Sequence, residues 1–144
     1  MKIFTIGFTK KTAEQFMNLL EDNHVRMIID IRLNNSSQLA GFAKGIDLKY
    51  FLKTIAGIDY KYYPNFAPSR ELLKDYQNGK IGWSEYVPQY LSILKGNDIL
   101  HTIDIDKFEN ACLLCSESLP DQCHRRLFAE YLQSHFQGIE IIHL

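Results

Sequence analysis

Short apolar runs alternate along this chain with segments in which apolar residues recur at helical spacing. The apolar runs cover residues 2–6, 25–31, 58–63, 111–115 and 139–143. Because strands that alternate with helices are joined by crossover connections, this pattern predicts a mainly parallel sheet. The run at 25–31 is nearly continuous and β-branched, which is typical of a strand covered on both faces. We therefore expect one α/β domain over residues 1–144, with three layers, about five strands and helices on both faces.

Residues that begin and end helices flank the segments between the predicted strands. Thr12 and Gln15 have the spacing of a capping box, and Asp47 is placed to cap a helix that Gly57 ends. Pro88 is compatible with its helical segment only if it lies in the first turn. The strongest helical pattern follows residue 121 and includes Leu127, Phe128, Tyr131, Leu132 and His135.

Charge and cysteine usage exclude several classes of protein. Sixteen Lys and Arg against seventeen Asp and Glu give a net charge of -1, so no bulk basic surface is available for duplex nucleic acid. No apolar run reaches the roughly 18–20 residues that a membrane span needs, and no signal peptide is recognisable. Three cysteines, an odd number, argue against a disulfide scaffold. We therefore expect a cytoplasmic protein without a membrane partner.

Polar and reactive residues gather where the predicted strands end. The carboxyl ends of parallel strands share one edge of a sheet, and ligands of open α/β folds bind in a crevice there. Charged groups that are removed from water usually serve binding or catalysis unless they pair with each other. The residues at these positions are Gly7 and Thr9 after the first strand, Asp30 and Arg32 at the second, Cys115 and Glu117 at the fourth, and Cys123, His124 and Arg125 at the start of the last helix.

These strand-end residues form motifs that resemble a known family. In this order along the chain, they resemble the conserved uncharacterised family called domain of unknown function 488, with the C-x-E…C-H-R element as the most specific part. The family usually has His and Ser after its first glycine, where this chain has Phe8 and Thr9, so a histidine role at that point is absent. Its glycine pair after the third strand is replaced by Phe66-Ala67-Pro68. The resemblance implies an α/β fold and a shared pocket, and it brings no established reaction. The motifs are Thr5-Ile6-Gly7, Asp30-Ile31-Arg32, Cys115-Ser116-Glu117 and Cys123-His124-Arg125.

Cys115 is either a nucleophile at a strand end or a buried structural thiol. The residue six positions later is Asp121, and Arg125 comes ten positions later, so the tight phosphate cradle of rhodanese-type and phosphatase-type sites is not present. Arg125 and the positive end of the last helix would lower the pKa of the thiol, whereas Glu117 would raise it. The sequence therefore leaves the direction of this pKa shift open.

The charged residues of the predicted crevice each have a structural and a functional interpretation. Glu117 is either a general acid or base, or one half of an ion pair with Arg125 or Arg32. His124 is either a proton shuttle or a core histidine with satisfied hydrogen bonds. Asp30 and Arg32 either form a salt bridge with each other, or Arg32 is left free to bind a phosphate or carboxylate.

Cys112 and Cys115 have the C-x-x-C spacing of a zinc ligand pair, which Cys123 and His124 would complete. Cys112 lies inside a predicted strand, however, and a separation of three places it on the opposite face from Cys115. Adjacent Cys123 and His124 would also be strained in reaching one metal ion. We therefore predict no metal ligands and no cofactor, and we interpret Cys112 as a small buried apolar residue.

The first functional hypothesis is an enzyme that binds a small anionic, nucleotide-like ligand. Glu117 and His124 would move protons, and Cys115 would act as a nucleophile or form part of the wall. The expected substrate-binding residues are Asp30, Arg32, Arg125, Cys123, Gly7 and Thr9. Two alternatives are a non-catalytic module that binds a nucleotide or nucleic acid, and a zinc-stabilised structural domain.

Overall fold

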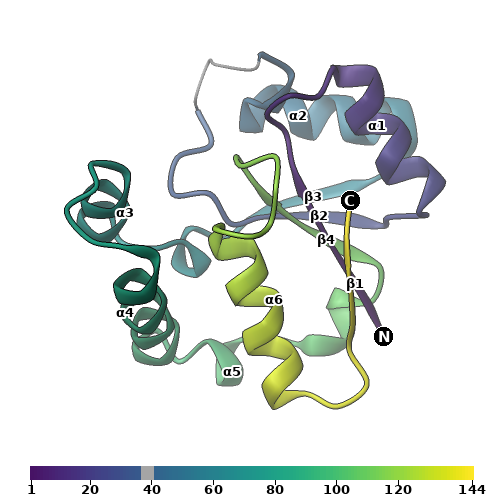
Figure 1. Ribbon diagram of the computed structural model, residues 1–144. Helices are drawn as coiled ribbons and strands as arrows, with labels where there is room; N and C mark the ends of the chain where they lie inside the picture. Colours follow the sequence, from purple (N-terminus) through teal and green to yellow (C-terminus); the bar gives the residue numbers. More distant parts are fainter. Residues whose placement is uncertain (37–40) are drawn as a thin grey trace.

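The computed structural model describes residues 1–36 and 41–144, which form a five-stranded sheet with helices on both sides (Figure 1). All pairs of neighbouring strands are parallel, and their order is β3-β2-β4-β1-β5. The predicted α/β fold with a parallel sheet is therefore confirmed. The strands are β1 (Lys2–Gly7), β2 (Met27–Asp30), β3 (Asp59–Tyr62), β4 (Ala111–Cys115) and β5 (Glu140–His143).

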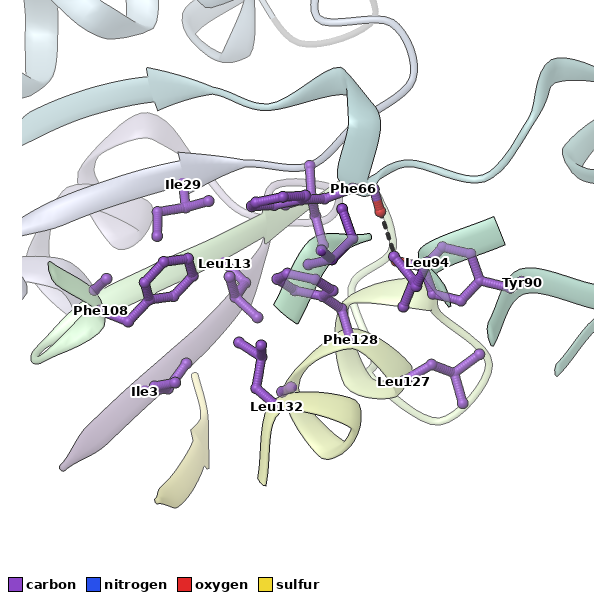
Figure 2. Close-up of a cluster of buried hydrophobic side chains, with 14 of the residues drawn as sticks. Ile3, Ile29, Phe66, Tyr90, Leu94, Phe108, Leu113, Leu127, Phe128 and Leu132 are labelled. Atoms are coloured by element: carbon purple, nitrogen blue, oxygen red, sulfur yellow. Dashed lines mark hydrogen bonds between the residues drawn. The ribbon is translucent and has the colours of Figure 1, made fainter. Parts of the chain in front are cut away.

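Alternate residues of the central strands form two separate cores. Phe4 and Cys112 pack with α1 (Ala13–Asp22), α2 (Gly45–Phe51) and the π-helical turn Leu52–Ala56. On the other face, Ile3 and Leu113 pack with the helices of the second half of the chain, where Figure 2 shows Phe128 and Leu132 beside them. The helices of that half are α3 (Arg70–Gln77), α4 (Trp83–Gly96), α5 (Ile99–Thr102) and α6 (His124–His135), and the short 3-10 helices are Gly41–Ala43, Pro64–Phe66 and Ile105–Phe108.

The helix boundaries confirm some of the predicted caps and contradict others. Thr12 and Gln15 form the predicted capping box, and Gly57 ends its helix in the left-handed conformation with φ 66°. The prediction for Asp47 is wrong, because α2 already begins at Gly45 and Asp47 lies in its first turn. Pro88 is inside α4 rather than in the first turn, since the helix begins at Trp83. It lies on the exposed side, where water reaches the carbonyl group that its missing N–H leaves unpaired.

Within residues 1–36 and 41–144, no helix combines the length and the apolar character that crossing a bilayer requires.

The capping box of α1 gives a direct test of how this helix is stabilised. The Thr12 hydroxyl accepts a hydrogen bond from the Gln15 amide at 3.1 Å, and the Gln15 side chain accepts one from the Thr12 amide at 2.9 Å. We expect Thr12→Ala to lower the free energy of unfolding by about 1 kcal/mol, because it leaves helix amides without a partner. Urea unfolding measures this change. Thr12→Ser is the matched control, and an equal loss in both variants would contradict the capping role.

Candidate functional site

A crevice opens at the carboxyl edge of the sheet between the loops that follow β2 and β4. The chain leaves β1 and β2 toward the face of α1 and α2, whereas it leaves β4 toward the face of α6 (Figure 1). Neighbouring loops that depart to opposite faces create the crevice typical of open parallel sheets. We call this cavity of about 290 Å³ the switch-point pocket. It is lined by Arg32, Leu33, Asn34, Leu73, Tyr76, Gln77, Trp83, Tyr86, Cys115, Ser116, Glu117, Gln122, Cys123 and His124.

Asp30 and Arg32 form a buried ion pair at the end of β2. The Arg32 guanidinium donates from Nε to Asp30 Oδ1 at 2.9 Å and from a second nitrogen to Oδ2 at 2.7 Å. The Tyr60 hydroxyl also donates to Oδ2, at 2.6 Å. Burial lowers the pKa of Arg32, but the hydrogen bonds and charge of Asp30 outweigh it and raise this pKa overall. Asp30 therefore orients Arg32, and its own oxygens are already occupied.

One nitrogen of the Arg32 guanidinium, NH1, takes no part in this ion pair. The side chain is only 3% exposed and lines the switch-point pocket, yet its NH1 has no hydrogen-bond partner among the residues described. Its Cζ lies over the Phe8 ring, 5.3 Å from the ring centre, which is within the range of a cation–π contact. A buried N–H without a partner is costly, which makes it a favourable position for an oxygen atom of a ligand.

Arg125 is held differently, although its Nε also lacks a hydrogen-bond partner among the residues described. It is fully buried and donates hydrogen bonds to the carbonyl oxygens of Glu117 and of Ser118, the second at 3.3 Å. It also contacts Cys123 Sγ at 3.8 Å. The described lining of the pocket does not include Arg125. Its guanidinium holds the loop between β4 and α6 from behind, so its position is that of a residue that shapes the site.

Gly7 and Thr9 hold the same loop from the other side. A Cβ atom at Gly7 would overlap the Glu117 carbonyl and lie 2.7 Å from Arg125 NH1, so this position accepts only glycine. The Thr9 amide and hydroxyl both donate to the Ser116 carbonyl, at 3.2 and 2.7 Å. Neither residue lines the switch-point pocket as described. Both are placed to position the loop and not to contact a ligand in this pocket.

Glu117 extends an exposed carboxylate at the pocket. Of the two alternatives for Glu117, the ion pair with Arg125 or Arg32 is not found in the described parts of the chain. Arg125 instead bonds the main-chain carbonyl of Glu117, while Asp30 occupies Arg32. The carboxylate reaches water and needs no buried partner.

Cys115 and His124 contact each other at the base of the pocket. The His124 Nε2 lies 2.8 Å from the Ile31 carbonyl oxygen, which only accepts hydrogen bonds, so Nε2 carries the hydrogen. Nδ1 is then the basic nitrogen, and it lies 3.5 Å from Cys115 Sγ, with Nε2 at 3.7 Å. The Ile31 carbonyl thus fixes the tautomer in which His124 accepts a proton from the thiol.

The environment of Cys115 favours its thiolate. The hydrogen bond from Cys123 lowers the pKa of Cys115 most, burial opposes it, and the Ser116 and Glu117 amides together with the Arg125 charge lower it further. The same hydrogen bond, followed by burial, raises the pKa of Cys123. The direction of the pKa shift that the sequence left open is therefore downward. Its strongest cause is Cys123, which the sequence analysis considered only as a substrate-binding residue or metal ligand.

Cys115, Cys123 and His124 also have the chemistry of metal ligands. Their ligating atoms lie within 4.8 Å of one another, so adjacent Cys123 and His124 do bring their ligating atoms close together. Two thiols and one imidazole are a donor set that suits zinc. Cys112 does not belong to this set, because it is buried in the core on the opposite face of the sheet, as the sequence predicts.

An aromatic wall completes the pocket, and the sequence analysis did not predict it. Trp83 and Tyr86 stack with their ring centres 5.2 Å apart, and Tyr76 contacts both. The Tyr76 hydroxyl donates to Gln122 at 2.7 Å, which connects the α3–α4 segment to the loop after β4. These residues come from helices and not from strand ends, so the strand-end rule gave no signal for them.

Fold and site together define an α/β protein that carries a thiol–imidazole pair at the carboxyl edge of a parallel sheet. The chain belongs to the family described as Domain of unknown function DUF488, whose model matches residues 12–132. This match includes Asp30 and Cys115 with their neighbours, whereas Gly7 precedes it. Comparisons with curated proteins and with solved structures find no match.

The Asp30–Arg32 pair predicts a large difference between two similar substitutions. Asp30→Asn should lower the free energy of unfolding by about 3 kcal/mol, because it leaves a buried guanidinium without its counter-charge. Asp59→Asn breaks an ion pair with Lys53 in which both side chains are about two-thirds exposed, and it should leave the unfolding midpoint nearly unchanged. Urea unfolding of both variants checks this, and equal losses would show that burial of the Asp30 pair is unimportant.

Proposed function

We propose that this protein is an enzyme in which the Cys115 thiolate attacks an electrophilic group of a small anionic substrate. The observation that carries the proposal is the contact of Cys115 Sγ with His124, whose other ring nitrogen donates to Ile31. A nucleophile beside a base that a third group orients is the arrangement that activates thiols and hydroxyls in covalent catalysis.

The proton in this reaction passes between two named atoms. His124 Nδ1 takes the proton of the Cys115 thiol, and the sulfur electron pair forms a bond to the electrophilic atom of the substrate. The leaving group departs with the electron pair of its broken bond and receives the proton from the imidazolium. The Ile31 carbonyl stabilises the charged ring while it holds this proton. Glu117, at the exposed side of the pocket, is placed to exchange protons with water.

The pocket favours a substrate with an anionic group and a planar ring. The unpaired NH1 of Arg32 is the proposed anchor for a phosphate or carboxylate oxygen. Trp83 and Tyr76 offer aromatic surface, and Asn34 and Gln77 offer amides, within the same cavity. A nucleotide or a fragment derived from nucleic acid has this combination of features.

The two alternative functions leave part of the site unused. A non-catalytic binding module would use Arg32 and the aromatic wall but gives no role to the Cys115–His124 contact. A structural zinc site needs four protein ligands, whereas three ligating atoms converge here beside an open pocket. Three unpaired cysteines in the structure are compatible with the reducing cytoplasm that we propose as the location.

The lowered pKa of Cys115 predicts selective alkylation. Each unit by which a thiol pKa falls increases its thiolate fraction near pH 7 about tenfold, so Cys115 should react with iodoacetamide at lower pH than cysteines of the unfolded chain. Burial raises the pKa of Cys112, which should remain unlabelled. Mass spectrometry across a pH series measures both sites. Cys115→Ala should remove the rapid reaction and Cys112→Ala should retain it, and rapid labelling of Cys112 instead would overturn the proposal.

The proposed anion anchor predicts a charge preference in the same reaction. Iodoacetate and iodoacetamide differ mainly in the carboxylate, which Arg32 NH1 would attract. We expect the ratio of iodoacetate to iodoacetamide rates at Cys115 to exceed that of free cysteine by about fivefold, which corresponds to about 1 kcal/mol. Arg32→Lys keeps a cation beside Asp30 but removes the free NH1, so it should return the ratio toward that of free cysteine. A wild-type ratio equal to that of free cysteine would exclude an anion site at Arg32.

A further inference from the structure

Cys123 has no role in the proposed reaction, although its sulfur lies beside that of Cys115. The two Sγ atoms are within 4.8 Å of each other, and both side chains are less than 5% exposed. Both residues line the switch-point pocket, which gives small molecules access to them. A reactive thiolate with a second thiol next to it is the arrangement found in two-cysteine redox sites.

We propose that Cys115 and Cys123 form a reversible intramolecular disulfide after a hydroperoxide oxidises Cys115. The proposal rests on the proposed function to the extent that both need a reactive Cys115 thiolate. It adds a second class of substrate, hydroperoxides, and a second state of the site in which the nucleophile is blocked.

The loop between the two cysteines allows the sulfurs to approach. Cys115 is the last residue of β4 and Cys123 is the N-cap of α6, so seven residues separate them. A disulfide brings its sulfurs to about 2.05 Å, which requires a limited movement from the present separation. Thr9 and Arg125 hold the first half of this loop, whereas Leu119, in its middle, is 68% exposed, so the second half can adjust without disturbing a core.

Oxidation of Cys115 removes a negative charge that disfavours a thiolate at Cys123. The pKa of Cys123 is raised first by its hydrogen bond to Cys115, then by burial, and then by the negative charge of Cys115. A sulfenic acid at Cys115 is neutral, so the charge repulsion disappears and the thiolate no longer competes for the Cys123 hydrogen. Arg125, 3.8 Å from Cys123 Sγ, then stabilises a thiolate at Cys123.

The reaction balances in two steps. In the first, the Cys115 thiolate, whose proton has passed to His124, attacks the distal oxygen of the hydroperoxide and the O–O bond breaks. The products are the Cys115 sulfenic acid and an alkoxide or hydroxide that takes this proton from His124, so that the ring is neutral again. In the second, Cys123 loses its proton to His124 and attacks the Cys115 sulfur. The S–O bond breaks, and the departing hydroxide takes that proton to form water. The protein loses two electrons and the hydroperoxide gains them.

The product is identified by counting thiols and by mapping the bond. Protein treated with a chelator is oxidised with one equivalent of hydrogen peroxide, unfolded, and titrated for thiols. We expect three free thiols to fall to one, a loss that dithiothreitol reverses. Cleavage after glutamates places Cys112 and Cys115 on peptide 110–117 and Cys123 on peptide 118–130. A disulfide between these peptides in Cys112→Ala assigns the bond to Cys115 and Cys123.

A second variant tests the role of Cys123 as the resolving thiol. In Cys123→Ser, Cys115 should stop at the sulfenic acid, which dimedone traps, or proceed to the sulfinic acid, and no intramolecular disulfide should form. Three thiols that remain free in the oxidised wild-type protein, or sulfinic acid that forms as quickly in wild type as in this variant, would overturn the proposal. Mapping of the wild-type and Cys112→Ala proteins decides the question even if Cys123→Ser does not fold.

The alkylation experiment separates this inference from the proposed function. If iodoacetamide labels Cys115 rapidly near neutral pH but peroxide forms no 115–123 disulfide, only the redox proposal fails. If Cys115 resists both reagents, the nucleophile itself is wrong and both proposals fail together.

Discussion

A fully buried guanidinium determines the form of this site. Arg125 cannot be removed from water without hydrogen-bond acceptors, and the loop after β4 supplies them as the carbonyls of Glu117 and Ser118. Gly7 lacks a side chain where the Glu117 carbonyl approaches β1. The loop path that supplies these two carbonyls to Arg125 is also the path that places Cys123 at the start of α6 and beside Cys115. The thiol pair is therefore a consequence of how one cation is solvated by main-chain atoms.

The two buried arginines differ in how their charges are balanced. Arg32 is paired with the Asp30 carboxylate, whereas Arg125 meets only carbonyl dipoles and sulfur in the described structure. The positive charge of Arg125 therefore shifts the pKa of neighbouring groups. Burial first, and then Arg125, lower the pKa of both Lys11 and His143. Among the causes that lower the pKa of Cys115, Arg125 follows Cys123 and the Ser116 amide. Arg32 thus neutralises the buried Asp30 carboxylate, and Arg125 stabilises a thiolate at Cys115.

The sequence predicts the fold and the edge of the sheet where the site lies, because periods of 2 and 3.6 residues and the ends of strands are visible in it. It does not predict the partners within the site. Glu117 illustrates this, since Arg125 uses its carbonyl and not its carboxylate, and main-chain acceptors carry no signal in a sequence. Trp83 reaches the pocket through the packing of α4, which depends on tertiary contacts. Cys123 was expected beside a ligand, but its proximity to Cys115 depends on the path of the loop.

The two cysteines of β4 show what the sheet edge contributes. Cys112 and Cys115 are the same residue type, three positions apart on one strand, and both are buried. Cys112 is enclosed in an apolar core, and this burial is the main cause of its raised pKa. At Cys115, the Cys123 thiol and the amides of Ser116 and Glu117 outweigh burial. These groups surround Cys115 because β4 ends there and the loop to α6 returns toward this residue. The lowered pKa of Cys115 thus follows from its place at the end of β4, whereas Cys112, inside the strand, has a raised pKa.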